Sequence, residues 1–484
     1  MNILMATSEF SPLGSTGELG DQVNTLTIEL KRLGHDVSVV MPFYRSTREG
    51  KLDYKSAELD FQVNLGGKRV SANVVETKTP EGIPVYLIRR DEYFDRTGIY
   101  GADGRAYEDN AERFIFFAKA VLELAGRLTP TPELIHSHDW PTALIPVFVK
   151  DRQLPFQTVL TVHDLEYQGS FWSFDFPLTN LPGSYFGPRG VEFYGRLNFL
   201  KGGILSAGAV TLQGEVALFE AFSPQHGFGL DAVLKEHRQQ LFGIPHGVDY
   251  SQTNPPFEIL FGERAKSDAI TGKPGARQAL LEQLELERNP KGIVISLPIE
   301  SHDGVAFEPL RPILDLVLTA DTCMVVTGTA PDLDVTDLII AERKYPTRFT
   351  HRPDADSKLE RAALAGSDVV LLPSSLGFNG TTAIAAMRYG TLPIVKSRGG
   401  VYQIVADYDR GAGTGSGFVY AGDSSLALWD AVRRANELYQ RPDEWSKLAD
   451  RAKSIDFSWV ESAKAFVKLY AGLLRHRPAK ATAA

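Results

Sequence analysis

The stretch Pro373-Ser-Ser-Leu-Gly-Phe-Asn-Gly-Thr-Thr-Ala-Ile-Ala-Ala-Met-Arg-Tyr-Gly390 decides the fold class. It follows an apolar run at 368–372 that predicts a buried parallel strand, and its second part, 382–389, predicts a helix. A strand that enters a helix through a glycine-containing turn directs backbone N–H groups and the positive end of the helix dipole at whatever lies above it. The arrangement is a seat for phosphate, yet the turn contains no acidic or basic residue.

The same alternation of strand and helix extends in both directions from this stretch. Apolar runs separated by helical segments predict a parallel sheet in each half of the chain, covered by helices on both faces. Two such α/β halves predict a ligand cleft at the carboxyl ends of the strands. The runs lie at 2–6, 34–42, 134–138 and 158–163 in the first half, and at 292–296, 322–327, 348–351, 368–372 and 392–396 in the second.

Composition limits the class of protein. The chain has 484 residues, 43% of them hydrophobic, which suggests two or more globular domains. Its net charge of −9 disfavours a nucleic-acid partner. Cys323 is the single cysteine, so no intrachain disulfide is expected. Without a signal peptide or a membrane-length apolar segment, the sequence predicts a soluble, cytoplasmic protein with no membrane partner.

Ordered motifs along nearly the whole chain resemble the bacterial glycogen synthases and plant starch synthases of the ADP-glucose type. In the first half they include Ser8-Glu-Phe-Ser-Pro, Thr16-Gly-Glu-Leu-Gly-Asp21, His136-Ser-His-Asp-Trp140 and Thr161-Val-His-Asp-Leu165. In the second half the longest is Ala386-Met-Arg-Tyr-Gly-Thr-Leu-Pro-Ile-Val395. These enzymes transfer glucose from a nucleotide sugar to an α-glucan.

This resemblance implies the glycosyltransferase B (GT-B) fold, in which two Rossmann-like domains face a central cleft. The expected organisation is an acceptor-side domain at 1–250 and a nucleotide-sugar domain at 251–456. A crossover helix at 457–476 would return to the first domain, and a disordered tail would occupy 477–484. The family mechanism retains the anomeric configuration and needs no metal or organic cofactor.

Several charged positions of the family are vacated in this chain. The departing nucleoside diphosphate requires fixed cations, and loss of one preorganised electrostatic donor typically costs about 10²–10³ in rate. An Arg, two Lys and a Glu of the family are replaced, and a loop glycine has become acidic. The vacated positions are Ser15 (for Lys), Glu18 (for Gly), Pro298 (for Arg), Asp303 (for Lys) and Gly377 (for Glu).

These replacements favour a pseudoenzyme of α-glucan metabolism. It would bind glycogen, a maltooligosaccharide, ADP-glucose or ADP, and act as a scaffold or regulator, with a protein partner in glucan metabolism. One alternative is an active α-1,4-glucan synthase whose phosphate cations are supplied by Lys396 or Arg398. Another is a GT-B enzyme with a different donor or acceptor.

Other family positions are retained as candidate site residues. His163 and Asp139 are the candidate catalytic cleft residues, although His163 could instead be structural and Asp139 a helix N-cap. The candidate sugar and acceptor contacts are Tyr93, Trp140 and His246, where core packing is the alternative for the two aromatic side chains; His246 replaces a family Asn. The candidate nucleotide and phosphate positions are Gly17, Gly20, Gly380 and Thr382. His136 and His138 share one strand face, but a metal site is disfavoured because no third ligand is in register.

Overall fold

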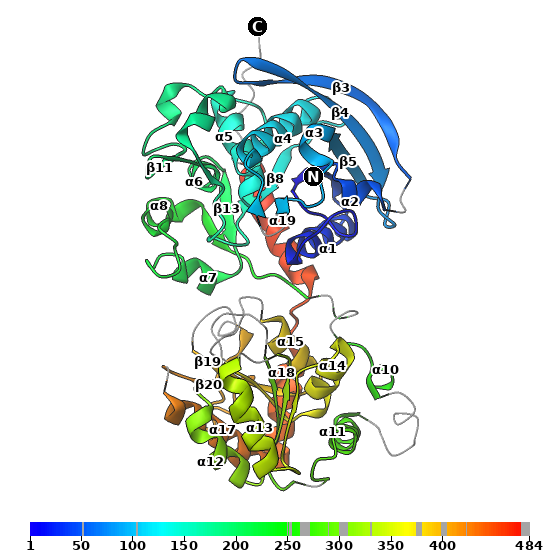
Figure 1. Ribbon diagram of the computed structural model, residues 1–484, viewed down its shortest axis with the longest axis vertical. Coiled ribbons are helices and arrows are strands. Elements are labelled where there is room, and N and C mark those ends of the chain that lie inside the picture. Colours follow the sequence, from blue (N-terminus) through cyan, green and yellow to red (C-terminus); the bar gives the residue numbers. More distant parts are fainter. Residues whose placement is uncertain are drawn as a thin grey trace. The chain divides into compact units, whose positions relative to one another are not determined.

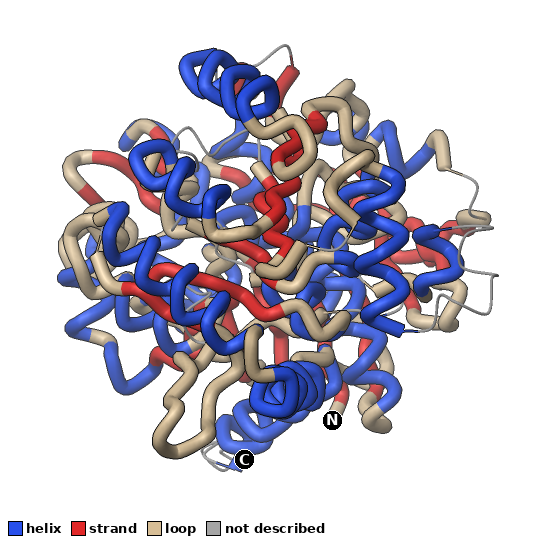
Figure 2. The backbone as a smooth tube through the Cα atoms, turned by 90° about the horizontal axis from the view of Figure 1, so that it is seen from below, coloured by secondary structure: helices blue, strands red, loops and turns tan. Residues whose placement is uncertain are grey.

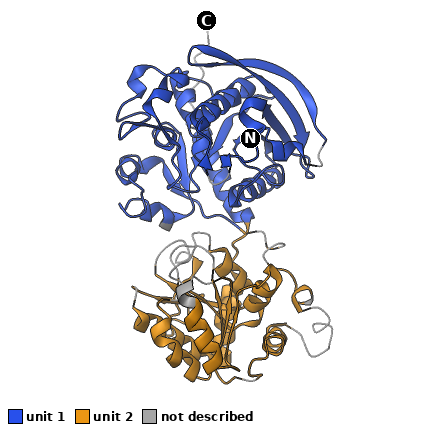
Figure 3. Cartoon of the chain, in the orientation of Figure 1, with its two compact units in different colours: residues 1–247, 459–484 blue, residues 248–458 orange. Residues whose placement is uncertain are grey.

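Two sheets, one mainly parallel and one entirely parallel, organise the chain in the computed structural model, each in its own compact unit (Figures 1 and 3). Unit 1 comprises Met1–Gly247 and Trp459–Ala484, and unit 2 comprises Val248–Ser458. The structure describes residues 1–50, 53–102, 105–248, 250, 254–261, 272–288, 290–299, 308–329, 332–373, 380–397, 404–422 and 424–475. The expected tail at 477–484 lies outside these residues.

Unit 1 contains a nine-stranded sheet that is parallel over its first seven strands. The remaining two, β4 and β3, form a long antiparallel hairpin at one edge, visible as the curved blue ribbon in Figure 1. The sequence prediction of an all-parallel sheet missed this hairpin. In pairing order the strands are β14 (Leu241–Gly243), β13 (Ala209–Leu212), β9 (Gln157–Thr161), β8 (Leu134–His138), β1 (Asn2–Ala6), β2 (Asp36–Pro42), β5 (Pro84–Arg89), β4 (Lys68–Lys78) and β3 (Lys55–Leu65).

Helices cover this sheet, and their apolar residues explain their placement. Fourteen of the sixteen residues of α4 (Asn110–Ala125) are buried, and its run of Phe, Ala and Leu packs in the unit 1 core. The C-terminal helix α19 (Trp459–Arg475) belongs to unit 1 and packs beside α1 (Glu18–Arg32). The other helices of unit 1 are α2 (Arg45–Arg48), α3 (Asp91–Phe94), α5 (Leu144–Asp151), α6 (Phe199–Ile204), α7 (Glu215–Glu220) and α8 (Asp231–Glu236).

Two smaller sheets complete unit 1. One has three antiparallel strands, β10 (Ser170–Phe171), β12 (Arg196–Asn198) and β11 (Glu192–Phe193). The other pairs β6 (Gly101–Ala102) with β7 (Arg105–Ala106). Short 3-10 segments lie at Trp140–Thr142, Ser173–Thr179, Gly183–Tyr185 and Arg238–Gln240.

Unit 2 contains a six-stranded sheet in which every pairing is parallel. In pairing order the strands are β17 (Phe349–Arg352), β16 (Cys323–Thr327), β15 (Val294–Pro298), β18 (Val369–Leu372), β19 (Leu392–Lys396) and β20 (Phe418–Tyr420). The first five fall on the five apolar runs of the second half of the sequence, and β20 was not foreseen. The buried branched residues of these strands explain why this sheet needs cover on both faces.

The helices of unit 2 pack against the strands of this sheet. Figure 2 distinguishes the helices of the whole chain, in blue, from its strands, in red. Helices α11 (Gly272–Gln283) and α14 (Ser357–Gly366) pack against each other, with Gly366 lying so close to Leu280 that an added Cβ would be 2.6 Å from the Cβ of Leu280. The described helices are α10 (Phe257–Phe261), α11 (Gly272–Gln283), α12 (Leu314–Thr319), α13 (Asp332–Lys344), α14 (Ser357–Gly366), α15 (Thr381–Arg388), α17 (Ser425–Tyr439) and α18 (Pro442–Ser454), with a 3-10 turn at Arg311–Ile313. No described helix is long and apolar enough to cross a membrane.

Candidate functional site

The loop after β1 is held in shape by a buried carboxylate. Glu9 is 4% exposed, and its oxygens accept from the Thr16 backbone N–H at 2.5 Å, from the Thr16 hydroxyl at 3.0 Å and from the Tyr100 hydroxyl at 2.7 Å. Ser8 also contacts the Tyr100 hydroxyl, at 2.8 Å. The loop therefore enters α1 in a fixed conformation, which satisfies the polar groups of its buried part.

The glycines of this loop have different roles. Gly20 lies within the first turn of α1, where an added Cβ would be 2.6 Å from the Ser15 Oγ and 3.2 Å from the Ser11 backbone N. No side chain fits there, so Gly20 is required for close backbone packing. Gly17 is the N-cap residue in an extended conformation, and an added Cβ would meet nothing within 4 Å.

The two substituted positions of the loop make their own internal contacts. Ser15 donates its hydroxyl to the Gly17 carbonyl at 2.7 Å. Glu18 opens α1 and accepts from the Gln22 side-chain amide at 3.2 Å, one turn further along the helix. Its carboxylate sits at the positive end of the helix dipole, where an anion is favoured. From Ser8 to Asp21 the sequence contains no Lys or Arg.

His163 follows β9 and has protein partners at all four of its polar atoms. Its backbone N–H donates to the Asp139 carboxylate at 2.7 Å, and its carbonyl accepts from Gln213 at 3.3 Å. In the ring, Nδ1 lies 2.8 Å from the Gln22 Oε1 and Nε2 lies 3.1 Å from the His138 Nδ1. Burial lowers the pKa of His163 well below its ordinary value, so the ring is neutral at pH 7.

Asp139 and Trp140 occupy the turn between β8 and the following helical segment. Asp139 has a φ of 58°, a left-handed conformation that is uncommon for a residue with a side chain. Its backbone N–H donates to the Thr161 carbonyl at 2.9 Å, which aims its carboxylate at the N–H of His163. Burial raises the pKa of Asp139 to about 7, against the lowering effect of its backbone N–H donors. Trp140 packs edge-on against Phe114, with ring centroids 4.9 Å apart.

The two histidines of β8 face the core side by side. Their ring centroids are 4.2 Å apart, and both side chains are at most 1% exposed. His136 contacts the Tyr470 hydroxyl of α19 at 2.7 Å and the Thr161 hydroxyl at 2.6 Å. Burial lowers the pKa of His136 to about 3 and that of His138 well below its ordinary value. No group of three or more metal-ligating side chains was found among the described residues.

The remaining candidates of unit 1 differ in their surroundings. His246, after β14, lies against His163 with ring centroids 5.0 Å apart and stacks on Trp459 of α19. Its Nδ1 is buried without a hydrogen-bond partner, and burial lowers its pKa to about 4. Tyr93 is 8% exposed, and its hydroxyl donates to the Glu112 carboxylate. The structure thus brings His246 beside His163 and places Tyr93 in the core.

In unit 2, the candidate phosphate turn lies only partly within the described residues. Gly380 is the N-cap of α15 with a φ of 54°, and Thr382 lies in the first turn of that helix. Pro298 ends β15 and pairs with Thr327 in the adjacent strand. The other vacated positions, Asp303 and Gly377, lie outside the described residues, as does Arg398.

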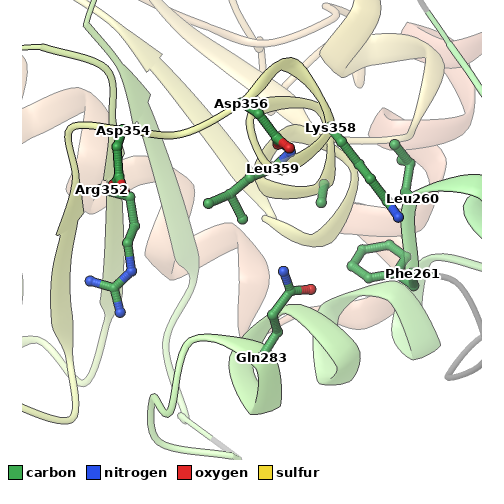
Figure 4. A pocket seen from close by; sticks show the side chains of 9 residues that line it. Leu260, Phe261, Gln283, Arg352, Asp354, Asp356, Lys358 and Leu359 are labelled. Carbon is green, nitrogen blue, oxygen red and sulfur yellow. The ribbon is translucent and has the colours of Figure 1, made fainter.

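A hollow of about 560 Å³ lies on another part of unit 2 (Figure 4). Its apolar lining comes from α10 and α14, including Phe261 and Leu359, and its charged lining includes Arg352 and Lys358. Arg352 is paired with Glu342 at 3.3 Å. The hollow contains none of the candidate site residues predicted from the sequence.

Comparison with known proteins identifies the family. Residues 2–236 match the family model for the starch synthase catalytic domain. Glycogen synthase 2 of Geobacter sulfurreducens is 32% identical over 476 residues, covering 97% of this chain and 98% of that protein. Glycogen synthase of Moorella thermoacetica is 33% identical, covering 99% and 98%. This chain belongs to the glycogen/starch synthase family.

Two solved structures share the fold of this chain. The catalytic domain of Arabidopsis thaliana starch synthase IV, bound to ADP and acarbose, superposes with a TM-score of 0.77 at 25% identity, covering 98% of this chain and 99% of that one. Sucrose-phosphate synthase of Thermosynechococcus elongatus has a TM-score of 0.54 at 17% identity and shares the fold. The expected GT-B fold and family resemblance are therefore confirmed.

Sequence reasoning missed the residues that surround His163 and His136. Gln22 lies one residue beyond the glycine-loop motif and has no chemical signature of its own. Tyr470 is 334 positions from His136, and only the packing of α19 on unit 1 brings them together. The spacing of Glu18 and Gln22, four residues apart at the start of a predicted helix, was the one local signal available.

Proposed function

We propose that this protein is a member of the glycogen/starch synthase family with impaired glucose transfer, which binds α-glucan or nucleotide and serves as a scaffold or regulator of α-glucan metabolism. Starch synthase IV was solved with ADP and acarbose, which supports these two ligand classes. The family of this chain supports glucan as its polymeric partner.

The observation that carries the proposal is the charge of the loop that begins α1. Ser15 replaces a family Lys there, and its hydroxyl donates a hydrogen bond to the Gly17 carbonyl. The neighbouring Glu18 carboxylate occupies the helix N-terminus, where it would repel a diphosphate. Because charge develops on the leaving diphosphate during transfer, an anion at this place raises the barrier where a cation would lower it.

Changes elsewhere in the sequence act in the same direction. Pro298 and Asp303 stand where the family has Arg and Lys, and Gly377 stands where it has Glu. Replacing one preorganised donor typically costs about 10²–10³ in rate, although such losses do not simply add. Single substitutions back to the family residue are therefore expected to leave transfer undetectable.

The direct test is transfer of radiolabelled glucose from ADP-glucose to glycogen by the purified chain, beside a glycogen synthase relative at equal concentration. We expect a rate at least about 10²-fold below the relative. Turnover near ~10 s⁻¹, the median for enzymes, would refute the proposal. Retardation of the same protein in native gels containing glycogen tests the binding role, and unretarded migration of folded protein would exclude a glucan scaffold.

If the purified chain does transfer glucose, the alternative to test is an active synthase in which other cations, Lys396 or Arg398, neutralise the diphosphate. Lys396 ends β19, and Arg398 follows two residues later in the sequence. If these side chains neutralise the diphosphate, replacing both with Ala should abolish transfer without unfolding the chain. Transfer that survives the double replacement would exclude them as the source.

A further inference from the structure

The ring of His163 stands at the centre of a hydrogen-bonded chain that begins at the surface of unit 1. It runs from Glu18 to Gln22 at 3.2 Å, from Gln22 to His163 at 2.8 Å and from His163 to His138 at 3.1 Å. All four residues belong to unit 1 and come from α1, β8 and the turn after β9. Glu18 is exposed, whereas His138 is 1% exposed, so the chain leads from solvent into the core.

The first link fixes the direction of every later one. An ionised carboxylate only accepts hydrogen bonds, so Gln22 must turn its NH₂ group towards Glu18. The carbonyl oxygen of the Gln22 side chain then faces the His163 Nδ1, which must carry the proton. In a neutral imidazole the other nitrogen is bare, so Nε2 accepts from the Nδ1–H of His138.

His138, at the inner end of the hydrogen-bonded chain, supports the same direction of donation. With its proton on Nδ1, His138 has a bare Nε2, and this atom is buried without a hydrogen-bond partner. The reverse direction would turn the Gln22 carbonyl oxygen towards the Glu18 carboxylate, acceptor against acceptor. It would also leave a buried N–H of His138 without an acceptor, and orphaned buried N–H groups are rare in proteins.

We propose that Glu18 and Gln22 are positioning residues that hold His163 as the Nδ1–H tautomer, with both ring nitrogens bound to protein and neither offered to a ligand. Glu18 stands where the family has glycine, so this chain has gained the group that orients Gln22. A sugar hydroxyl that approaches His163 must displace Gln22 or His138. The consequence for ligand binding rests on the proposed function, whereas the tautomer itself does not.

Nitrogen NMR of protein labelled with ¹⁵N-histidine measures the tautomer directly, because protonated and bare imidazole nitrogens resonate far apart. The chain has 10 histidines, and a His163→Gln variant assigns the signal. We expect His163 to show a protonated Nδ1 and a bare Nε2 at pH 7.5. A protonated Nε2 in the unaltered protein would overturn the proposal.

Two variants of Gln22 separate positioning from simple packing. Gln22→Glu keeps an acceptor oxygen at the same reach and should retain the protonated Nδ1. Gln22→Leu removes the acceptor and should release His163 from the exclusive Nδ1–H state. Thr25→Val, on the same helix, is the matched control, because the Thr25 hydroxyl donates to the Asp21 carbonyl and has no contact with His163. An unchanged tautomer in Gln22→Leu would refute the assignment.

Glu18→Ala provides the second route if Gln22→Leu does not fold. Glu18 is exposed, so its removal should leave the fold intact while allowing the Gln22 amide to turn over. We expect averaged nitrogen signals for His163 in this variant, and a pure Nδ1–H state would refute the role of Glu18.

Maltotriose titration of Gln22→Leu tests the consequence for binding. Freeing one ring nitrogen should strengthen binding several-fold, up to about tenfold, the range of one net hydrogen bond. An affinity equal to that of the unaltered protein would refute the ligand consequence. If neither protein binds maltotriose, glucan binding at this site fails, and the NMR result still decides the tautomer.

Discussion

Lowering the pH from 7.5 to 5 should destabilise unit 1 through the buried histidines of β8. His136 is fully buried, and burial lowers its pKa from 6.5 to about 3. The unfolded chain therefore binds a proton at pH 5 that the folded chain excludes, and stability falls as the pH drops below 6.5. His138, which is 1% exposed and also has a lowered pKa, acts in the same direction.

The size of the effect follows from the pKa difference. At pH 5 the unfolded histidine is 1.5 pH units below its ordinary pKa, and each unit is worth 1.36 kcal/mol, so His136 contributes about 2 kcal/mol of destabilisation. Asp139 opposes it, because burial raises its pKa to about 7 and the folded state takes up a proton there as the pH falls. The dependence of stability on pH is therefore a sum of stabilising and destabilising contributions. Only a comparison of the unaltered chain with a His136 variant isolates the contribution of His136.

The assay is urea unfolding at pH 7.5 and pH 5 of the unaltered chain and of His136→Gln. Replacing Trp429 and Trp445 with Phe in both proteins confines tryptophan fluorescence to unit 1, since both residues lie in unit 2. The unaltered chain should lose about 2 kcal/mol more between the two pH values than the variant. Equal losses in the two proteins would refute the claim that His136 stays neutral in the folded state.

Three further changes test the packing of the two units. Tyr470→Phe removes the hydroxyl that binds a β8 histidine and should cost unit 1 about 1–3 kcal/mol in urea unfolding, because a buried nitrogen loses its partner; an unchanged midpoint would contradict this. Gly169→Ala should lower the melting temperature, since Gly169 has a φ of +60° and its Cβ would lie 2.6 Å from a tryptophan ring; a folded variant of equal stability would disprove the clash. Asp368→Asn should destabilise unit 2 by about 3 kcal/mol, the low end of the range for a buried ion pair, because Asp368 is buried and the Arg277 side chain, which is 15% exposed, loses its anion; a loss under about 1 kcal/mol, the size expected of a surface pair, would show that solvent screens the pair.

The vacated family positions fall into two groups. Ser15 and Glu18 have defined partners in unit 1, and both use their polar atoms within the protein. Asp303 and Gly377 contribute to the functional proposal only through their chemical identity. The proposed impairment of glucose transfer therefore rests most directly on the residues at the start of α1.

The sequence alone determined the fold class, the family and nine of the fifteen described strands of the two main sheets. Apolar runs such as 368–372 and 392–396 became β18 and β19 because a strand buried on both faces must be apolar along its whole length, and this pattern is local. Strand β3 was not predicted from the sequence, although polar and apolar residues alternate along 55–65. Such an alternation is local, and it does not show which edge of which sheet the strand would join.

Only the tertiary structure decided what the site residues touch. The motif predicts His163 as a site residue. The hydrogen bonds at its two ring nitrogens, however, come from Gln22, which is 141 residues away, and from His138 in the neighbouring strand. Likewise, Tyr93 matches a family position, and its burial follows from the packing of α3 against α4 residues such as Phe116. The sequence specifies the residue type at each site position. The hydrogen-bond partners of those residues are set by packing between distant segments, and no local sequence pattern predicts them.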